Sequence, residues 1–316
     1  METGGSYSPC GCKVFVVIHP VAGKCNIKEV RELITKTLKE TGCEIQVYET
    51  TGKENLPDIV REAVKKYFNL FVVAGGDGTV SDVAEGLVGT NIPLGIVPVG
   101  TGNVLARELW IPVNIKKACK VIADRHNVTS LDAMQVGNRY YFQTLSAGFA
   151  SLMIRDTRRE HKRIYGVAAY LWTGLKKLLG FQPIKFCVNY DGNQYECYAK
   201  EVALMNAGTI GRRPIALGKS IRVDDGKIDI CIIRARNFID CLVLAVRIVL
   251  RLQKYDRNIE YFTAHRNIRI ETDEPVVVQA DGEVIGTTPV EVNILPRTVK
   301  IIVPAMNRKN KIKLFL

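Results

Sequence analysis

The chain has 316 residues, and at roughly 150 residues per domain this length predicts about two domains, each with its own core. Hydrophobic residues make up 47% and charged residues 24%, which excludes a disordered, collagenous or membrane-spanning chain. The 44 Lys and Arg residues exceed the 32 Asp and Glu residues, and the net charge of +12 should attract phosphorylated ligands, nucleic acid or an anionic membrane.

The nine cysteines are an odd number and mostly stand far apart, which favours a reduced, cytoplasmic protein over a disulfide framework. No signal-peptide pattern is visible at the start of the sequence. The most apolar stretch, residues 241–250, is interrupted by Arg247 and is shorter than the roughly 20 residues of a membrane span. Any membrane contact is therefore expected to be peripheral.

Between residues 14 and about 124, short β-branched runs alternate with helical periods, which predicts a parallel sheet with crossover helices. Helices are expected after the capping residue Asn26, and again after Asn55 and Pro57. The expected strands are 14–18, 45–48, 70–74 and 94–97. Because each strand runs into a loop at its carboxyl end, these loops should line the edge of the sheet where α/β folds bind ligands.

After about Asn127, strands follow strands. Hairpin signals stand at Gly137 with Asn138 and at Asp191 with Gly192, and further strands are expected at 228–233 and 276–280. This pattern predicts a mostly antiparallel β domain.

The predicted architecture is therefore a Rossmann-like, three-layer α/β domain over residues 1–127, followed by an antiparallel β-sandwich domain over 128–303. Helical stretches at 164–179 and 238–252 interrupt the second domain. The basic tail, 304–316, is expected either to return to the first domain or to stay loose.

The run Gly75-Gly76-Asp77-Gly78-Thr79 lies directly after an apolar strand and before a helix. Glycines allow the backbone to approach a phosphate closely, and the N-terminus of the following helix adds positive potential. A tight turn that happens to be rich in glycine is the alternative. The position of the run between a strand and a helix favours phosphate binding.

Two more strand ends have the same character. Residues 98–103, Pro-Val-Gly-Thr-Gly-Asn, leave one strand and enter a helix, and residues 19–24, His-Pro-Val-Ala-Gly-Lys, follow the first strand. The P-loop and protein-kinase signatures are absent, and a dinucleotide fingerprint would need glycine where Ser81 and Leu105 stand. Three small-residue loops at one sheet edge predict a nucleotide site of another kind.

In these motifs, and in a late Asp281-Gly282-Glu283, the sequence resembles the diacylglycerol kinase catalytic-domain family, in particular the soluble bacterial lipid kinases, which are also similar to sphingosine kinases. The likeness runs from Lys13 to Pro304. It implies an NAD-kinase-like first domain and an ATP-dependent kinase that acts on a lipid hydroxyl, with the nucleotide held between the two domains. The nucleotide contacts that it implies are His19, Pro20, Val21, Ala22, Gly23, Thr50, Gly75, Gly76, Asp77, Gly78, Thr79, Val80, Ser81, Asp82, Gly100, Thr101 and Asn103.

The resemblance also assigns the acidic residues. Asp281 and Glu283 match the carboxylates from which such enzymes draw the general base, and Asp77 would orient phosphates or Mg²⁺. Taken alone, Asp281 and Gly282 would read as a hairpin turn. Residues 222–227 resemble a segment that holds a structural Mg²⁺ through Asp225, with Arg222 and Lys227 beside it, although an Asx turn explains the same residues.

Two departures from the family pattern concern the binding loops. His19 stands in place of Asn, so an imidazole replaces a neutral amide, and nucleotide affinity is expected to depend on pH. Val104 stands where many members have Asp, which leaves acceptor specificity open.

A basic cluster precedes the apolar stretch 164–179. It fits either an anionic lipid surface, at about 1 kcal/mol per charge, or an ordinary solvated helix face. The residues of the cluster are Arg155, Arg158, Arg159, Lys162 and Arg163.

The sequence therefore predicts a cytoplasmic, peripherally membrane-bound kinase that uses ATP and Mg²⁺ to phosphorylate a lipid, with diacylglycerol as the favoured acceptor. An NAD kinase and a catalytically silent nucleotide-binding regulator are the alternatives. No zinc-finger, RNP or helix-turn-helix signature is visible, so specific nucleic-acid binding is not expected. The oligomeric state stays open, with a homodimer as one candidate.

Overall fold

The computed structural model describes residues 11–20, 26–124, 127–156, 181–210, 215–216, 221–234, 240, 243, 247 and 256–305. Its internal contacts divide the chain into two compact units, Met1–Leu131 with Arg297–Leu316, and Asp132–Pro296. Strands β5 (Asn127–Val136) and β18 (Val290–Val303) each contribute residues to both units. The predicted helix at 164–179, most of 238–252 and the tail from 306 lie outside the described residues.

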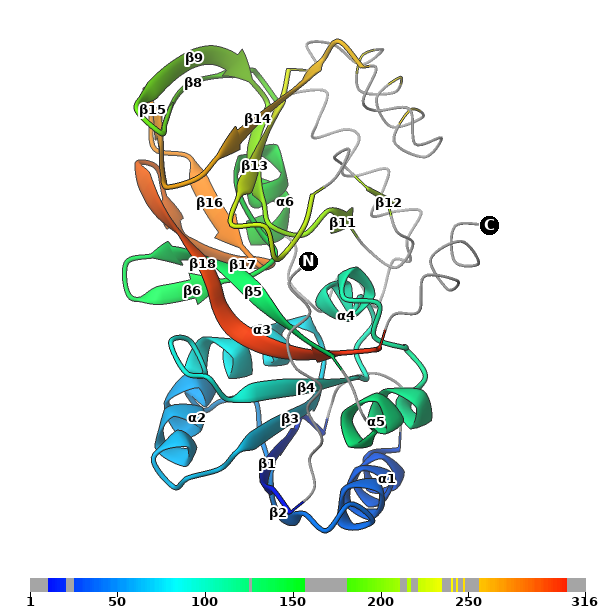
Figure 1. Ribbon diagram of the computed structural model, residues 1–316. Helices are drawn as coiled ribbons and strands as arrows, with labels where there is room; N and C mark the ends of the chain where they lie inside the picture. Colours follow the sequence, from blue (N-terminus) through cyan, green and yellow to red (C-terminus); the bar gives the residue numbers. More distant parts are fainter. Residues whose placement is uncertain are drawn as a thin grey trace. The chain divides into compact units, whose positions relative to one another are not determined.

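The first unit contains a parallel sheet with the strand order β2-β1-β3-β4, and residues 300–301 of β18 pair with β4 (Figure 1). Its strands are β1 (Lys13–Ile18), β2 (Glu44–Glu49), β3 (Leu70–Gly75) and β4 (Pro93–Pro98). Its helices are α1 (Ile27–Lys39), α2 (Leu56–Val64), α3 (Asp77–Gly86), α4 (Val104–Glu108) and α5 (Ile115–Ala123).

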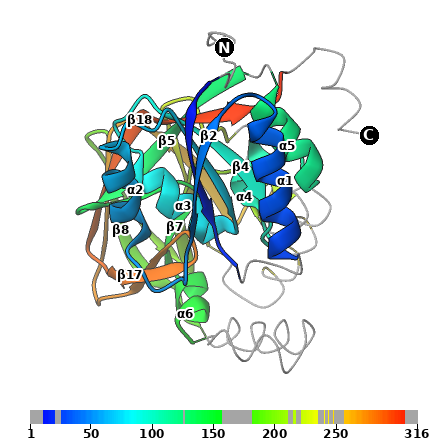
Figure 2. The ribbon, with the colours of Figure 1, turned by 90° about the horizontal axis from the view of Figure 1, so that it is seen from below.

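Helices cover both faces of this sheet. Figure 2 shows α1 and α5 on one side of the strands and α2 and α3 on the other, which confirms the predicted three-layer α/β class. Asn26 caps α1, as predicted, by accepting a hydrogen bond from the Lys28 N–H at 3.1 Å. Apolar residues at helical spacing, Val30, Ile34 and Leu38, are buried against the sheet. None of the described helices has both the length and the apolar character to cross a membrane.

The register of the parallel strands brings their carboxyl ends to one edge. Ile18, the last residue of β1, lies opposite Glu49 of β2 and Ala74 of β3. One residue further along β3, Gly75 lies opposite Pro98, the last residue of β4. The loops that follow β1, β2, β3 and β4 therefore begin side by side, as expected for an α/β fold.

The second unit is antiparallel. One sheet has the order β14-β13-β10-β7-β16-β17, and the other pairs β9, β8, β15 and the first part of β18. The strands are β6 (Arg139–Tyr141), β7 (Thr144–Gly148), β8 (Ile184–Tyr190), β9 (Asn193–Ala199), β10 (Glu201–Met205), β11 (Thr209–Ile210), β12 (Ile215–Ala216), β13 (Ile228–Ile233), β14 (Ile259–Ala264), β15 (Asn267–Thr272), β16 (Val277–Ala280) and β17 (Glu283–Thr287). Helix α6 (Phe149–Asp156) follows β7.

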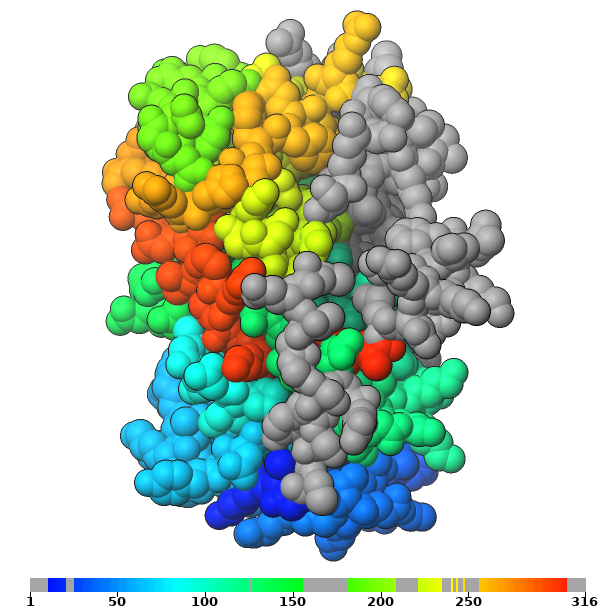
Figure 3. All heavy atoms as spheres, in the orientation of Figure 1, coloured from blue at the N-terminus to red at the C-terminus, as the bar shows by residue number. Residues whose placement is uncertain are grey.

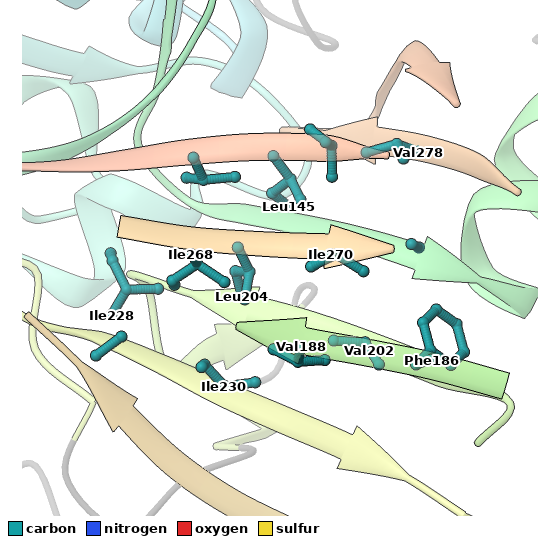
Figure 4. Close-up of a cluster of buried hydrophobic side chains, with 14 of the residues drawn as sticks. Leu145, Phe186, Val188, Val202, Leu204, Ile228, Ile230, Ile268, Ile270 and Val278 are labelled. Atoms are coloured by element: carbon teal, nitrogen blue, oxygen red, sulfur yellow. The ribbon is translucent and has the colours of Figure 1, made fainter. Parts of the chain in front are cut away.

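The inner faces of these two sheets form one hydrophobic core. Figure 4 shows the side chains of Leu145, Leu204 and Ile230 from one sheet close to those of Val188 and Ile268 from the other, and all of them are completely or almost completely buried. In the space-filling view, the β8–β9 hairpin (green) lies against later strands of the same unit (orange) (Figure 3). The predicted β-sandwich is confirmed.

Both predicted hairpins are present. Gly137 and Asn138 join β5 to β6, and Asp191 and Gly192, both with positive φ, join β8 to β9.

Candidate functional site

The first glycine loop forms a sharp transition from strand to helix. Strand β3 ends at Gly75, Gly76 is the N-cap of α3, and Asp77 begins the helix. A Cβ on Gly75 would lie 2.6 Å from the Thr79 Cβ, so glycine is required for this close packing. A Cβ on Gly78 would meet nothing within 4 Å, and Gly78 is exposed. The first N–H groups of α3 therefore lie on an open surface suited to an anion.

The second glycine loop is in backbone contact with the first. A Cβ on Gly100 would lie 2.5 Å from the Cα of Gly76, which no side chain could tolerate. Asn103, in the left-handed region at φ 52°, closes the second loop by accepting the Gly100 N–H at 3.0 Å and donating to the Gly100 carbonyl at 2.8 Å. The two loops therefore form one continuous surface, with Gly78 and Thr101 accessible to a ligand.

Asp77 joins the two loops. Its Oδ2 accepts the Asn103 N–H at 2.8 Å, and its Oδ1 accepts the Val104 N–H at 2.6 Å, so this carboxylate caps α4. Burial raises the pKa of Asp77 above the ordinary carboxyl value, against the lowering effects of these two N–H groups and of Arg107. The predicted role toward phosphates or Mg²⁺ thus belongs to a carboxylate that already holds the loops together.

Thr50 and His19 lie at the ends of β2 and β1. The buried Thr50 donates from its hydroxyl to Glu54 Oε2 at 2.8 Å, and Glu54 also accepts the N–H groups of Thr51 and Lys53. These backbone hydrogen bonds, that of Thr51 above all, hold the pKa of Glu54 well below its usual range. The His19 ring lies over Gly52, whose Cβ would come within 3.0 Å of the ring carbon Cε1.

The remaining predicted nucleotide residues differ in how exposed they are. Pro20 is exposed next to His19, whereas Val21, Ala22 and Gly23 lie outside the described residues. Val80 and Ser81 are buried on α3. Asp82, one residue further along α3, is half-buried.

In the second unit, Asp281 and Gly282 form the turn between β16 and β17, with φ of 48° and 89°. The Asp281 carboxylate accepts three backbone N–H groups, from Phe142 at 3.0 Å, Gln143 at 2.9 Å and Thr144 at 3.1 Å. Phe142 and Gln143 join β6 to β7 and Thr144 begins β7, so the carboxylate anchors the turn to a central strand of its sheet. Glu283, directly after the turn, is exposed.

The third acidic segment, residues 222–227, forms an Asx turn. Asp225 Oδ1 accepts the Lys227 N–H at 3.2 Å, and burial raises the pKa of Asp225. Gly226 donates to the buried Asp132 at 2.6 Å, and the Arg222 guanidinium pairs with Asp224 at 2.8 Å. In the described parts of the chain no three His, Cys, Asp or Glu residues gather as metal ligands. A cation here would therefore depend on Asp225, backbone carbonyls and water.

Several residues that shape the site were not predicted. Glu54 stabilises the loop after β2, and Arg107 holds the second glycine loop by donating from Nε to the Gly102 carbonyl at 2.9 Å. In the second unit, Asn206 donates to the carbonyls of Asp132 and Phe142, both at 2.8 Å. Glu54 had a local signal, because it follows Thr51 at the spacing of a capping box. Asn206 had none, because its partners are 74 and 64 residues away.

The sequence and structure were compared with known proteins. The family model of the diacylglycerol kinase catalytic domain matches residues 13–136. The model described as the YegS C-terminal NAD kinase beta sandwich-like domain matches residues 143–303.

Curated relatives match over almost the whole chain. A diacylglycerol kinase of Bacillus subtilis is 28% identical over 294 residues, covering 92% of this chain and 95% of that protein. A diacylglycerol kinase of Staphylococcus aureus is 27% identical, covering 92% of this chain and 91% of the relative. A crystal structure of a protein described as a putative diacylglycerol kinase from Bacillus anthracis superposes with a TM-score of 0.78 at 26% identity, covering 93% and 95% of the two chains.

Proposed function

Because the chain belongs to the diacylglycerol kinase catalytic-domain family, we propose that it is an ATP-dependent lipid kinase that transfers the γ-phosphate to a lipid hydroxyl. Diacylglycerol is the favoured acceptor and phosphatidic acid the product. The observation that carries the proposal is the pair of glycine loops in backbone contact at the carboxyl edge of the parallel sheet, joined by Asp77.

The glycine loops would bind the nucleotide phosphates. Phosphoryl transfer asks the protein mainly for positioning and for stabilisation of negative charge. Gly78 and Thr101 are accessible, and the open N–H groups at the start of α3 can donate to phosphate oxygens. His19 and Thr50, at the neighbouring strand ends, would complete the nucleotide contacts.

The turn of Asp281 and Glu283 would provide the general base. As the lipid oxygen forms its bond to the γ-phosphorus, the bond from phosphorus to the β,γ-bridging oxygen breaks and ADP leaves. The hydroxyl proton passes to a carboxylate of the turn, which we assign to Asp281, with Glu283 beside it. The hydrogen bonds of Asp281 fix the direction of its carboxylate before substrate binds.

Mg²⁺ would bind with the phosphates of ATP and neutralise the charge that develops there. Asp77 would contribute by orienting the loop that receives them. A second, structural Mg²⁺ would bind at residues 222–227, through Asp225 and backbone oxygens of Arg222 and Lys227.

The lipid acceptor implies contact with a membrane surface. The net charge of +12 favours an anionic one, and binding would be peripheral. The basic cluster that we expect to contribute lies, from Arg158 onward, outside the described residues.

The test is transfer of phosphate from labelled ATP to a panel of lipids in mixed micelles, resolved by chromatography, with NAD offered in parallel. We expect label in phosphatidic acid and none in NADP. Label in NADP alone would identify an NAD kinase. ATP binding without transfer to any acceptor would identify a nucleotide-binding regulator.

A further inference from the structure

The catalytic turn adopts a backbone conformation that needs support. Both turn residues, Asp281 and Gly282, have positive φ, which glycine adopts readily and aspartate only at a cost in free energy. The Asp281 N–H donates to the Thr144 carbonyl at 2.9 Å, and the Asp281 carboxylate accepts the three N–H groups described above. These bonds hold the first turn residue.

A single side chain holds the second turn residue. Gln279, on β16, accepts the Gly282 N–H through Oε1 at 3.0 Å. Its Nε2 donates to the Ser146 hydroxyl at 3.0 Å. Because only the amide oxygen can accept from Gly282, this contact also fixes the orientation of the amide group. Gln279 is only 5% exposed and its bond to Ser146 is buried, whereas its bond to the exposed Gly282 is partly buried.

The partner of Gln279 is itself fixed. Ser146 lies opposite Gln279 on β7, a central strand of the sheet, and is 3% exposed. Its hydroxyl lies 3.3 Å from the Ser151 hydroxyl, and Ser151 donates to the Ser146 carbonyl at 2.8 Å. Burial raises the pKa of the neighbouring Glu201, and the Ser146 hydroxyl acts against this shift. Gln279 therefore connects the turn to a rigid, buried polar group.

We propose that Gln279 is a positioning residue for phosphoryl transfer: its amide fixes Gly282, and with it the direction in which Asp281 and Glu283 present their carboxylates. The inference rests on the proposed function. A carboxylate that is misplaced by about 1 Å can reduce catalysis by roughly a hundredfold. Loss of the Gln279 amide should therefore reduce kcat and leave substrate binding nearly unchanged.

The test compares Gln279→Met, which keeps the length of the side chain and removes both hydrogen bonds, with Thr288→Val. Thr288 is a matched control because it lies at the opposite end of the same hairpin, is 3% exposed, and accepts the Val276 N–H at 2.9 Å. Gln279→Glu, which keeps an oxygen for Gly282, serves as the conservative variant. The measurements are kcat and KM for ATP and lipid well below the unfolding temperature, and residue-resolved hydrogen exchange of the Gly282 amide.

For Gln279→Met we expect kcat to fall by roughly tenfold to a hundredfold, with both KM values within about twofold of wild type. Exchange at Gly282 should rise by about tenfold, the equivalent of one lost hydrogen bond. In Thr288→Val neither kcat nor Gly282 exchange should change. Gln279→Glu should keep Gly282 protected and lose less activity.

The proposal is overturned if Gly282 exchange stays at the wild-type rate in Gln279→Met, or if exchange rises and kcat does not fall. It is also overturned if Thr288→Val loses as much kcat as Gln279→Met, since the effect would then follow stability alone. If wild-type protein transfers phosphate to no lipid, the proposed function fails and the catalytic part of this inference with it. The Gly282 exchange rate then decides by itself whether Gln279 holds the turn.

Discussion

Asp77 in the first unit and Asp281 in the second have similar structural roles but hydrogen-bond partners at very different sequence separations. Each carboxylate accepts backbone N–H groups and fixes a loop. The partners of Asp77 are 26 and 27 residues away, in the loop after the neighbouring parallel strand and at the start of α4. The partners of Asp281 are 137 to 139 residues away.

This difference in sequence separation explains why the glycine motifs can be recognised from the sequence and the acidic turn cannot. The first unit builds its loops from local transitions between strand and helix, where Gly75 and Gly100 have identifiable steric roles. The second unit builds its acidic turn from a common hairpin dipeptide, which becomes distinctive only through distant partners. Mutations in the first unit should therefore affect nucleotide binding and folding together, and mutations at the turn should separate binding from catalysis.

The largest expected effect is at the turn. Asp281→Asn should reduce phosphate transfer by roughly 10²–10⁴-fold, the usual contribution of a general base, while ATP binding persists. Glu283→Gln is the matched variant, because Glu283 is exposed and the substitution changes charge alone. Transfer rates and ATP affinity of both variants check the assignment. If Glu283→Gln loses activity and Asp281→Asn keeps it, the base is Glu283 and Asp281 only anchors the turn.

A pair of glycine substitutions tests the first unit. Gly100→Ala places a Cβ 2.5 Å from the Gly76 Cα, so the two loops must separate, and both ATP affinity and the unfolding temperature should fall. Gly78→Ala meets nothing within 4 Å and lies in a helix, so the free energy of unfolding should rise by about 0.5–1 kcal/mol. Calorimetry and ATP titration measure both quantities.

The Gly78 variant is the more informative of the two, because it should change ATP affinity and stability in opposite directions. If phosphate binds at the start of α3, Gly78→Ala should weaken ATP binding although it stabilises the fold. Unchanged ATP affinity in Gly78→Ala would place the phosphates elsewhere.

One buried or hydrogen-bonded glutamate in each unit should make the free energy of unfolding depend on pH, and the two effects should have opposite signs. Glu201 in the second unit is 6% exposed, its Oε1 has no hydrogen-bond partner among the described residues, and burial raises its pKa to about 7. Between pH 4.5, the ordinary value, and pH 7, the folded protein keeps a proton that the unfolded chain releases. The free energy of unfolding should therefore fall through this window, by roughly 3 kcal/mol, and level off above it.

Denaturant unfolding at pH 5 and pH 8 tests this. In Glu201→Gln the free energy of unfolding should no longer fall between these two pH values. The variant should therefore be more stable, relative to wild type, at pH 8 than at pH 5. Glu54 in the first unit has a lowered pKa and contributes stability that is present above pH 4.5 and is lost as the pH falls further. Glu54→Gln should thus destabilise the protein at pH 8 and have little effect in strong acid. A wild-type profile that Glu201→Gln leaves unaltered would refute the role of Glu201.

The smallest effect is expected at residues 222–227. If Asp225 helps to bind Mg²⁺, millimolar Mg²⁺ should raise the unfolding temperature of wild type by about 2–4 °C relative to EDTA, and it should not do so in Asp225→Asn. Thermal unfolding with nucleotide omitted isolates this site. Equal shifts in both proteins would leave the segment as an Asx turn alone.

The sequence by itself determined the two architectures and the strand edge at which the glycine loops gather. The helical period and the strand alternation of the hydrophobic residues predicted the α/β and antiparallel classes, because burial of one face imposes these patterns locally. The same local signals located the capping residue Asn26 and the hairpins at Gly137 and at Asp191. Where a feature depends on neighbours within one turn or one strand, residue types are enough to predict it.

The tertiary structure alone decided what the functional residues touch. Gly75 and Gly100, which the sequence indicated as glycines for phosphate approach, are also required for close packing against Thr79 and Gly76. The anchoring of Asp281 and the amide contacts of Gln279 depend on strands that are far apart in the chain and adjacent in the sheet. The sequence pattern does not predict which distant N–H group will donate to a carboxylate, because strand order and register determine that partner only when the sheet assembles.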